Sequence, residues 1–292
     1  MASQAKLSRI ALKRILLATD FSLEALKALQ SAVSLARRYD ATLVLTHVLA
    51  TEGSMGADAW PALIDIMRKN AESEMAKLEG RDELKSVSHE MVMHAGGTWE
   101  VISRVLSDKD IDLIVMGTQG RGGMKKLLLG STAETVIRHA TCPVLTVGPH
   151  VRVIPKDRCA QVLYASDFSS GSRRALIYAL ALAEEDGAQL SLLHVIESKP
   201  ASQSELLEWK RQDSQQLLSM VPPDVNLNYE PALEVEIGIP EVEIVRLADE
   251  RNADLIIMGS HAGGTASTHL PWTTLHHVLQ HAHCPVLTVR GM

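Results

Sequence analysis

The 292-residue chain has few aromatic residues: four Trp, four Tyr and two Phe together make up 3% of it. Its core must therefore be built from Leu, Ile, Val, Ala and Met, and it lacks the aromatic surface on which single-stranded nucleic acids stack. The 35 acidic residues outnumber the 29 basic ones and give a formal net charge of −6. Because no excess of positive charge exists to hold a phosphate backbone, the composition argues against nucleic-acid binding.

Cysteine is also scarce. The three residues Cys142, Cys159 and Cys284 are too few, and odd in number, to form a disulfide framework, so we expect a reducing, cytoplasmic location. No apolar run approaches the roughly 18 residues that span a bilayer, which argues against a membrane protein. Two basic residues interrupt the apolar stretch of residues 1–20. We expect this segment to be a short arm that leads into a first strand rather than a signal peptide.

The chain consists of two copies of one unit. Three stretches recur, at offsets of 147 and 142 residues: residues 14–22 at 161–169, residues 111–117 at 253–259, and residues 138–147 at 280–289. A repeat of this length is a domain and is too long for a solenoid unit. Gly148 and Pro149 interrupt the chain between the copies. We therefore expect two domains, residues 1–150 and residues 151–292.

Short apolar segments alternate with amphipathic ones inside each copy. In the first copy we expect strands at residues 15–18, 43–49, 87–93, 113–116 and 144–147, and helices after a capping Ser22, from residue 61, and at residues 99–106 and 132–139. This alternation favours two similar doubly wound α/β domains, each a parallel sheet with helices on both faces. Such sheets bind ligands beyond the carboxyl ends of their strands. Thr19-Asp20 and Met116-Gly117 stand at two of these ends.

A glycine-rich loop follows the fourth expected strand. Gly117 and Gly120 permit sharp turns and let backbone N–H groups approach an anion closely. Gly130 and Ser131 precede a helix, whose first N–H groups attract anions, and Ser131 and Thr132 add hydroxyl groups. Three positive charges lie in the same loop: Arg121, Lys125 and Lys126. These are the parts of a di- or triphosphate site, although an ordinary connection in which Ser131 only caps the helix is the alternative. The spacing is neither a Walker loop nor the dinucleotide fingerprint.

The chain resembles the universal stress protein family in its tandem two-domain form. ATP-binding members of that family carry Gly-x2-Gly-x9-Gly-Ser/Thr after the fourth strand, and Gly117, Gly120, Gly130 and Ser131 meet this spacing. The aspartate after the first strand, the His-Val pair ending the second and the Cys-Pro-Val-Leu-Thr-Val ending also match. The resemblance covers nearly the whole chain. It implies that each domain is a five-stranded parallel sheet of order 3-2-1-4-5.

The resemblance also implies roles for residues in an ATP site of the first copy. Asp20 would accept hydrogen bonds from the nucleoside, with Thr19 beside it. Val48 would meet adenine through its backbone, and Met116 would pack near the base and ribose. The ribose and the phosphates, held with magnesium, would be surrounded by Gly117, Gln119, Gly120, Gly130, Ser131 and Thr132. The alternatives are that Asp20 caps the next helix and that Val48 and Met116 are ordinary core residues.

The second copy lacks the phosphate-binding parts of this loop. Ala262 replaces the second glycine, Trp272 stands where the first copy has Gly130, and Pro271 has no N–H to donate. The loop also has no Lys or Arg. We therefore expect Asp167 to remain at its strand end without ATP beside it. A loop shifted to the adjacent glycine could still accept a smaller ligand.

Five histidines crowd the last 25 residues of the chain: His269, His276, His277, His281 and His283. His281 follows His277 at the i, i+4 spacing, which places both on one helix face, close to Cys284. A zinc site would need a third ligand, so we expect surface histidines and no bound metal. Cys142 and Cys284 precede prolines at matching positions, and we expect buried, unreactive thiols.

Together these features predict an ATP-binding stress-response or signalling module. Hydrolysis needs a base or a positioned water and charge stabilisation; only Glu134 follows the loop, inside the helix, so we expect a weak ATPase at most. Bound ATP would order residues 120–130 and alter a surface for an unidentified protein partner. An enzyme such as an adenylyl-transferring relative is disfavoured because its added motifs are absent.

A nucleotide-independent scaffold is the alternative function. Residues 144–147 and 286–289 would be edge strands, which need covering. In the resembling family, single-domain members dimerise through this fifth strand. The two repeats would therefore pair within the chain, and whole chains could associate further into a homodimer.

Overall fold

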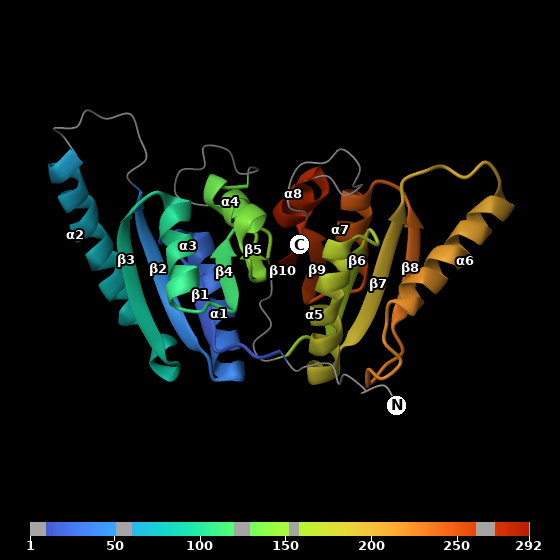
Figure 1. Cartoon of the computed structure of the whole chain (residues 1–292), viewed down its shortest axis with the longest axis horizontal. Helices are drawn as coiled ribbons and strands as arrows, with labels where there is room; N and C mark the ends of the chain where they lie inside the picture. The colour runs from blue at the N-terminus through green and yellow to red at the C-terminus, as the bar shows by residue number, and fades with distance from the viewer. Residues whose placement is uncertain (1–9, 51–59, 120–128, 152–157, 261–271, 292) are drawn as a thin grey trace. The chain divides into compact units, whose positions relative to one another are not determined.

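The chain forms two compact units, made mainly of residues 11–147 and residues 148–292. The computed structural model in Figure 1 describes residues 10–50, 60–119, 129–151, 158–260 and 272–291. Within these residues each unit contains five strands and four α-helices. None of the described helices is long and apolar enough to cross a membrane.

The N-terminal unit is a parallel five-stranded sheet with the order β3-β2-β1-β4-β5. Its strands are β1 (Arg14–Ala18), β2 (Thr42–Ala50), β3 (His89–Gly96), β4 (Leu113–Gly117) and β5 (Val144–Val147). Its helices are α1 (Leu23–Tyr39), α2 (Trp60–Glu79), α3 (Thr98–Asp108) and α4 (Ser131–His139). The third strand begins two residues later than predicted because a 3₁₀ turn (Leu84–Ser86) closes with Val87 N–H donating to the Leu84 carbonyl at 3.2 Å.

The C-terminal unit repeats this topology, with the order β8-β7-β6-β9-β10, again all parallel. Its strands are β6 (Gln161–Ser166), β7 (Gln189–Ile196), β8 (Ala232–Ile237), β9 (Leu255–Ser260) and β10 (Val286–Arg290). Its helices are α5 (Ser170–Asp186), α6 (Gln203–Ser219), α7 (Pro240–Glu250) and α8 (Trp272–His281). The predicted fold class and the 3-2-1-4-5 strand order are thus confirmed in both units.

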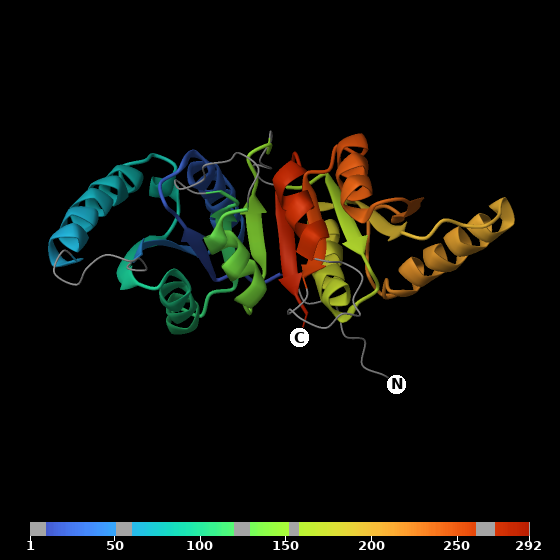
Figure 2. The ribbon, with the colours of Figure 1, turned by 90° about the horizontal axis from the view of Figure 1, so that it is seen from above.

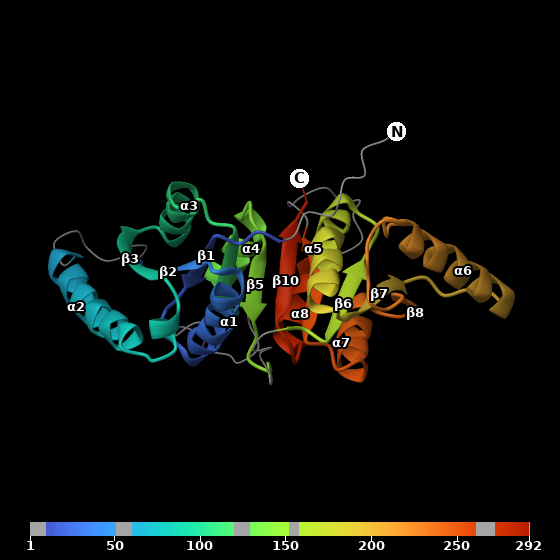
Figure 3. The same cartoon turned by 90° about the horizontal axis from the view of Figure 1, so that it is seen from below.

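Helices cover both faces of each sheet. In the N-terminal unit, α1 and α2 lie on one face and α3 and α4 on the other (Figure 3). In the C-terminal unit, α5 and α6 lie on one face and α7 and α8 on the other (Figure 2). The change of face coincides with the reversal of strand order between β1 and β4 and between β6 and β9. A doubly wound sheet opens a crevice at this switch point.

Aliphatic side chains fill the sheet interiors, as the scarcity of aromatic residues requires. Ile15, Leu16 and Leu17 on β1 are all 0% exposed, which is typical of a parallel strand covered on both faces. The helix that follows begins at the predicted cap: the Ser22 side chain accepts a hydrogen bond from Ala25 N–H at 3.2 Å. Because the central residues of β1 are fully buried and α1 is capped, the short turn between them, which contains Asp20, is held in place.

Candidate functional site

The carboxyl ends of β1 and β4 lie side by side in the N-terminal unit (Figure 1). Ala18 pairs with Met116 in the parallel register, so Thr19 follows β1 directly beside the end of β4. The start of α4 joins them because Gly130 N–H donates a 2.8 Å hydrogen bond to the carbonyl of Thr118. Two strand ends and one helix start therefore meet at the switch point.

Most of the predicted site residues that the structure describes lie at this meeting point. Val48 lies on β2, on the other side of β1 from β4, in register with His94 of β3. The other described members follow β1, end β4 or begin α4: Thr19, Asp20, Met116, Gly117, Gln119, Gly130, Ser131 and Thr132. Gly120, Arg121, Lys125 and Lys126 fall outside the described part of the chain.

Asp20 supports the turn between β1 and α1. Its Oδ1 accepts a 3.0 Å hydrogen bond from Ser22 N–H, while Ser22 itself caps the helix. The alternative that Asp20 caps the next helix is therefore wrong: Ser22 is the cap, and Asp20 supports the turn before it. Asp20 is half-buried, so its carboxylate remains accessible at the edge of the sheet.

A histidine from the neighbouring strand holds the end of β1. His47 donates from Nδ1 to the carbonyl of Thr19 at 2.8 Å, and its ring lies 4.4 Å from the ring of Phe21. Phe21 has φ 63°, a left-handed conformation that non-glycine residues rarely adopt. The contact between the two tilted rings and the bond from Phe21 N–H to Thr19 Oγ1, 3.1 Å long, stabilise this unusual turn.

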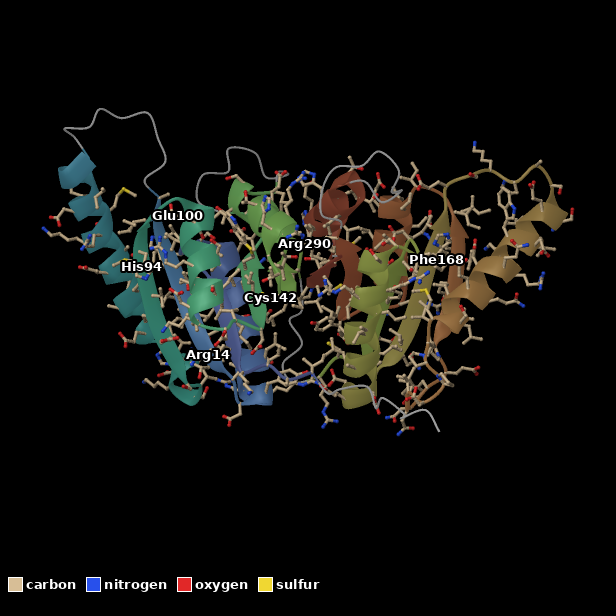
Figure 4. The ribbon with its side chains drawn as sticks, in the orientation of Figure 1. Arg14, His94, Glu100, Cys142, Phe168 and Arg290 are labelled. Carbon is tan, nitrogen blue, oxygen red and sulfur yellow. The ribbon has the colours of Figure 1, made fainter. Side chains whose placement is uncertain are left out.

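The C-terminal unit repeats the same arrangement. Phe168, labelled in Figure 4, has φ 60°, its ring lies 4.3 Å from that of His194, and His194 Nδ1 donates to the Ser166 carbonyl at 2.8 Å. Sequence reasoning did not assign a role to these aromatic and histidine residues. Their recurrence in both copies, 147 residues apart, is the signal that could have revealed it.

The first glycine of the loop is required by helix packing. A Cβ on Gly117 would lie 3.0 Å from Cβ of Glu24 at the start of α1, and a Cβ on Gly259 would lie only 2.4 Å from the backbone nitrogen of Ser172 on α5. Real Cβ contacts are essentially never as short as the one at Gly259, so a side chain there would push α5 off the sheet, whereas a side chain at Gly117 would force α1 to give way slightly. This packing explains why both copies keep the glycine although only one keeps the phosphate motif.

The start of α4 presents N–H groups to the switch point. Glu134 N–H donates to the Gly130 carbonyl at 2.9 Å, which makes Gly130 the capping residue and Ser131 the first helical residue. The alternative that Ser131 merely caps the helix is therefore wrong. The N–H groups of the first turn have no carbonyl partner within the helix, and the positive end of the helix dipole lies beside them.

A buried hydroxyl lies where the glycine loop leaves β4. Thr118 is 1% exposed, and its Oγ1 has no hydrogen-bond partner within the described part of the chain. Ser260, at the matching position, is in the same state. An unpaired buried hydroxyl costs about 1–3 kcal/mol. Each unit thus has, at the end of this strand, a buried hydroxyl without a hydrogen-bond partner among the described residues.

The C-terminal unit has a hollow of its own. It measures about 340 Å³ and lies at the carboxyl ends of β6 and β7, between α6 and α7. Its walls include Asp167, His194, Glu197, Asp213, Pro240 and Ile244. The expected replacement of phosphate-binding groups by Ala262, Pro271 and the Trp272 side chain falls outside what the structure describes and stays a prediction.

The histidines of α8 share one face, as predicted. The rings of His277 and His281 stack at 4.0 Å, and burial, together with the neighbouring His281, lowers the pKa of His277. His283 lies after the helix, outside this pair, and its Nδ1 forms a 2.7 Å hydrogen bond with Asp249. No group of three His, Cys, Asp or Glu side chains suited to a metal ion occurs among the residues that were placed.

The two cysteines that precede prolines differ in exposure. Cys284 is buried as predicted, whereas Cys142 is only partly so. Burial nevertheless raises the pKa of both thiols to about 12. Since the thiolate is the reactive form, both are unsuited to nucleophilic or redox chemistry.

Fold and site together define a tandem doubly wound α/β protein with one polar switch point in each unit. The chain belongs to the universal stress protein family, whose profile matches residues 11–148 and 160–290.

Individual relatives agree with this assignment. The chain is 33% identical over 138 residues to a universal stress protein of Methanocaldococcus jannaschii, a match that covers 46% of this chain and 81% of that protein. A universal stress protein of Mycobacterium tuberculosis is 27% identical over 221 residues, covering 72% and 71% of the two chains. The crystal structure of a universal stress protein from Archaeoglobus fulgidus shares the fold, with a TM-score of 0.71 over 95% of this chain and 96% of that chain at 24% identity.

Proposed function

We propose that the N-terminal unit binds ATP and that the protein acts as a nucleotide-dependent stress-response or signalling module. The observation that carries this proposal is the bond from Gly130 N–H to the Thr118 carbonyl. It fixes the start of α4 against the end of β4, one strand away from Asp20. A nucleotide has an anionic and an uncharged end, and a helix start near the end of β4 together with a carboxylate after the neighbouring β1 would suit these two ends.

The phosphates fit the start of α4. N–H groups of Ser131 and Thr132 belong to the first helical turn, where anions are stabilised, and both side chains add hydroxyl groups. Thr118 Oγ1 offers a further unpaired donor nearby within the described residues. A magnesium ion would be held mainly by phosphate oxygens, with a hydroxyl of Ser131 or Thr132 as a protein ligand, because Mg²⁺ prefers oxygen ligands and retains several waters.

The nucleoside fits the side of the crevice next to β1 and β2. Asp20 would accept hydrogen bonds from the nucleoside, and the backbone of Val48 would meet the base. Met116 is 4% exposed, so its side chain would form the floor of the site beneath the base and ribose. The Thr19 hydroxyl accepts a hydrogen bond from Phe21 N–H, so the role of Thr19 is to stabilise the turn.

Chemistry on the bound nucleotide would be slow or absent. Glu134 is the acidic residue nearest to the loop in sequence, and its backbone N–H is engaged in the α4 ladder. An acid placed one turn inside a helix does not stand in line behind a terminal phosphate held at the helix start. ATP would therefore act through binding, by favouring one arrangement of residues 120–130 that a protein partner recognises.

Calorimetric titration of the full chain with ATP, ADP and AMP, with and without magnesium, tests the proposal. Asp20→Ala should weaken ATP binding at least tenfold, since it removes the nucleoside's acceptor. Asp167→Ala, the matched change in the other unit, should leave ATP affinity unchanged. Absence of binding by all three nucleotides would remove the proposal, as would equal effects of the two substitutions.

A further inference from the structure

The hollow of the C-terminal unit combines apolar walls with carboxylates. Leu193, Val195 and Ile196 of β7 line it together with Pro240 and Ile244 of α7. The volume of about 340 Å³ falls within the range of about 300–1,000 Å³ that is usual for small-molecule sites. An apolar cavity with a few convergent polar groups is the ordinary form of a ligand site.

The charges that face the hollow are of one sign. Asp167, Glu197 and Asp213 line it, and no Lys or Arg is among the lining residues within the described part of the chain. The Asp213 side chain is 22% exposed and comes from α6, across the hollow from the strand ends. His194 is fixed through its Nδ1 by the Ser166 carbonyl, which leaves Nε2 directed toward Asp213, 4.0 Å away. A ligand with phosphate groups would meet carboxylates here without countercharge.

The helix start beside the hollow is also poorly suited to an anion. Helix α7 begins with Pro240, which has no N–H to donate. Two acidic residues, Glu241 and Glu243, occupy its first turn and oppose the positive end of the helix dipole. The corresponding helix of the N-terminal unit, α3, begins with Thr98 instead of a proline and has a single acidic residue, Glu100, in its first turn.

Asp167 has a counterpart in Asp20 of the first copy, but the other carboxylates of the hollow belong to segments that differ between the units. Ala50 stands in the first copy where the second has Glu197, 147 residues later. The inward face of α2, the helix that corresponds to α6, is apolar and carries the buried residues Ala71, Met75 and Leu78. The negative charge that Glu197 and Asp213 add to the hollow is therefore not a property of the common fold.

We propose that the C-terminal hollow binds a small organic amine in its protonated form. The apolar body of the ligand packs against Val195, Pro240 and Ile244, and its ammonium group lies between Asp213 and Asp167. Charge-assisted hydrogen bonds from an ammonium to carboxylates in a half-buried site are stronger than hydrogen bonds between neutral groups. This proposal does not depend on ATP binding in the other unit.

Three indole compounds that differ only in the charge of the side chain test the proposal: tryptamine (cationic), tryptophol (neutral) and indole-3-acetate (anionic). Titrated calorimetrically into the full chain, tryptamine should bind at least tenfold more tightly than tryptophol, and indole-3-acetate should not bind. Raising the salt concentration should weaken tryptamine binding, since screening acts on charge pairs. Equal binding of tryptamine and tryptophol would overturn the proposal, and so would no detectable tryptamine binding.

Two substitutions on α6 localise the site. Asp213→Asn keeps the size of the side chain and removes its charge, and it should lower tryptamine affinity at least tenfold. Glu208→Gln is the matched control, because Glu208 lies on the same helix, exposed and paired with Arg211 at 2.8 Å; tryptamine affinity should not change. Neither substitution should alter the affinity for ATP. An unchanged tryptamine affinity in Asp213→Asn, or its displacement by excess ATP, would refute the assignment to this hollow.

Discussion

The hydroxyl of Ser172 donates a 2.6 Å hydrogen bond to Oδ1 of Asp167, which also accepts from Ser169 N–H at 3.0 Å. Ala25 stands at the corresponding place in the N-terminal unit, 147 residues earlier, and cannot offer this bond to Asp20. Asp167 thus has a hydroxyl partner on α5 that the residue at the same place on α1 does not supply to Asp20.

Exchanging this hydroxyl between the units should change stability. Ser172→Ala should lower the stability of the C-terminal unit by about 1–3 kcal/mol, the range for a lost hydrogen bond to a charged acceptor. Hydrogen exchange of the α5 amides, followed by mass spectrometry, measures the effect, with the α1 amides as the internal reference. Faster exchange of α1 and α5 alike would contradict the localised role of this bond.

The reciprocal substitution should affect nucleotide binding. Ala25→Ser supplies Asp20 with the hydroxyl that Asp167 has, so part of its hydrogen-bonding capacity turns toward α1. We expect the affinity of the full chain for ATP to fall several-fold while its melting temperature stays the same or rises. A rise in ATP affinity would show that Asp20 does not act through its acceptor capacity.

The glycines that end β4 and β9 should tolerate alanine to different degrees. Gly117→Ala should destabilise the N-terminal unit by about 1–3 kcal/mol, the usual cost of overpacking, because the new Cβ falls 3.0 Å from Cβ of Glu24. Gly259→Ala should cost more, since its Cβ would meet backbone atoms of α5 at 2.4 Å. Gly80→Ala is the control, with its nearest contact at an ordinary 3.5 Å. Urea unfolding should rank Gly80→Ala first and Gly259→Ala last in stability.

Thiol labelling should distinguish folded from unfolded protein sharply. A pKa of about 12 leaves Cys142 and Cys284 almost wholly protonated at pH 8, and the thiolate fraction is about a thousandfold below that of a thiol with pKa 9. Both should therefore react with iodoacetamide at least a hundredfold more slowly in the folded chain than in urea. Peptide mass spectrometry reads the two sites separately, and similar rates in the two states would contradict the burial of these thiols.

Copying the second loop into the first tests the link between nucleotide and cellular role. Gly130→Trp should abolish ATP binding, because an indole at the start of α4 fills the space for phosphate, while the melting temperature changes little. Survival of cells under stress, compared with and without this substitution, measures the consequence. Preserved survival together with lost ATP binding would favour the scaffold function over the nucleotide-dependent one.

Much of the fold was predictable because its signals are local or repeated. The apolar run of β1 and the capping Ser22 follow from residue types and spacing, and the duplication confirmed each assignment in a second place. The strand order came from the family resemblance, since alternation alone does not order strands. The third strand began two residues late because a 3₁₀ turn used Val87, a tertiary detail that the polar–apolar pattern does not encode.

The site was predictable only in outline. Loop spacing placed Gly130 and Ser131 at a helix start, but which of them caps the helix depended on the bond from Glu134 N–H to the Gly130 carbonyl. The packing role of Gly117 was not predicted because the residue it packs against, Glu24 of α1, is about ninety residues away in the chain. The C-terminal hollow escaped notice for the same reason: Asp213 and Pro240 converge from two helices with no shared motif.

The paired Phe–His turns also bear on how the two halves diverged. Each turn shapes the end of its first strand through the protein's own rings and carbonyls, so neither needs a bound molecule to form. After duplication, one half could accordingly exchange its ligand preference without risk of unfolding. Under the two proposals made above, such a duplication would give one polypeptide two sites for chemically opposite compounds.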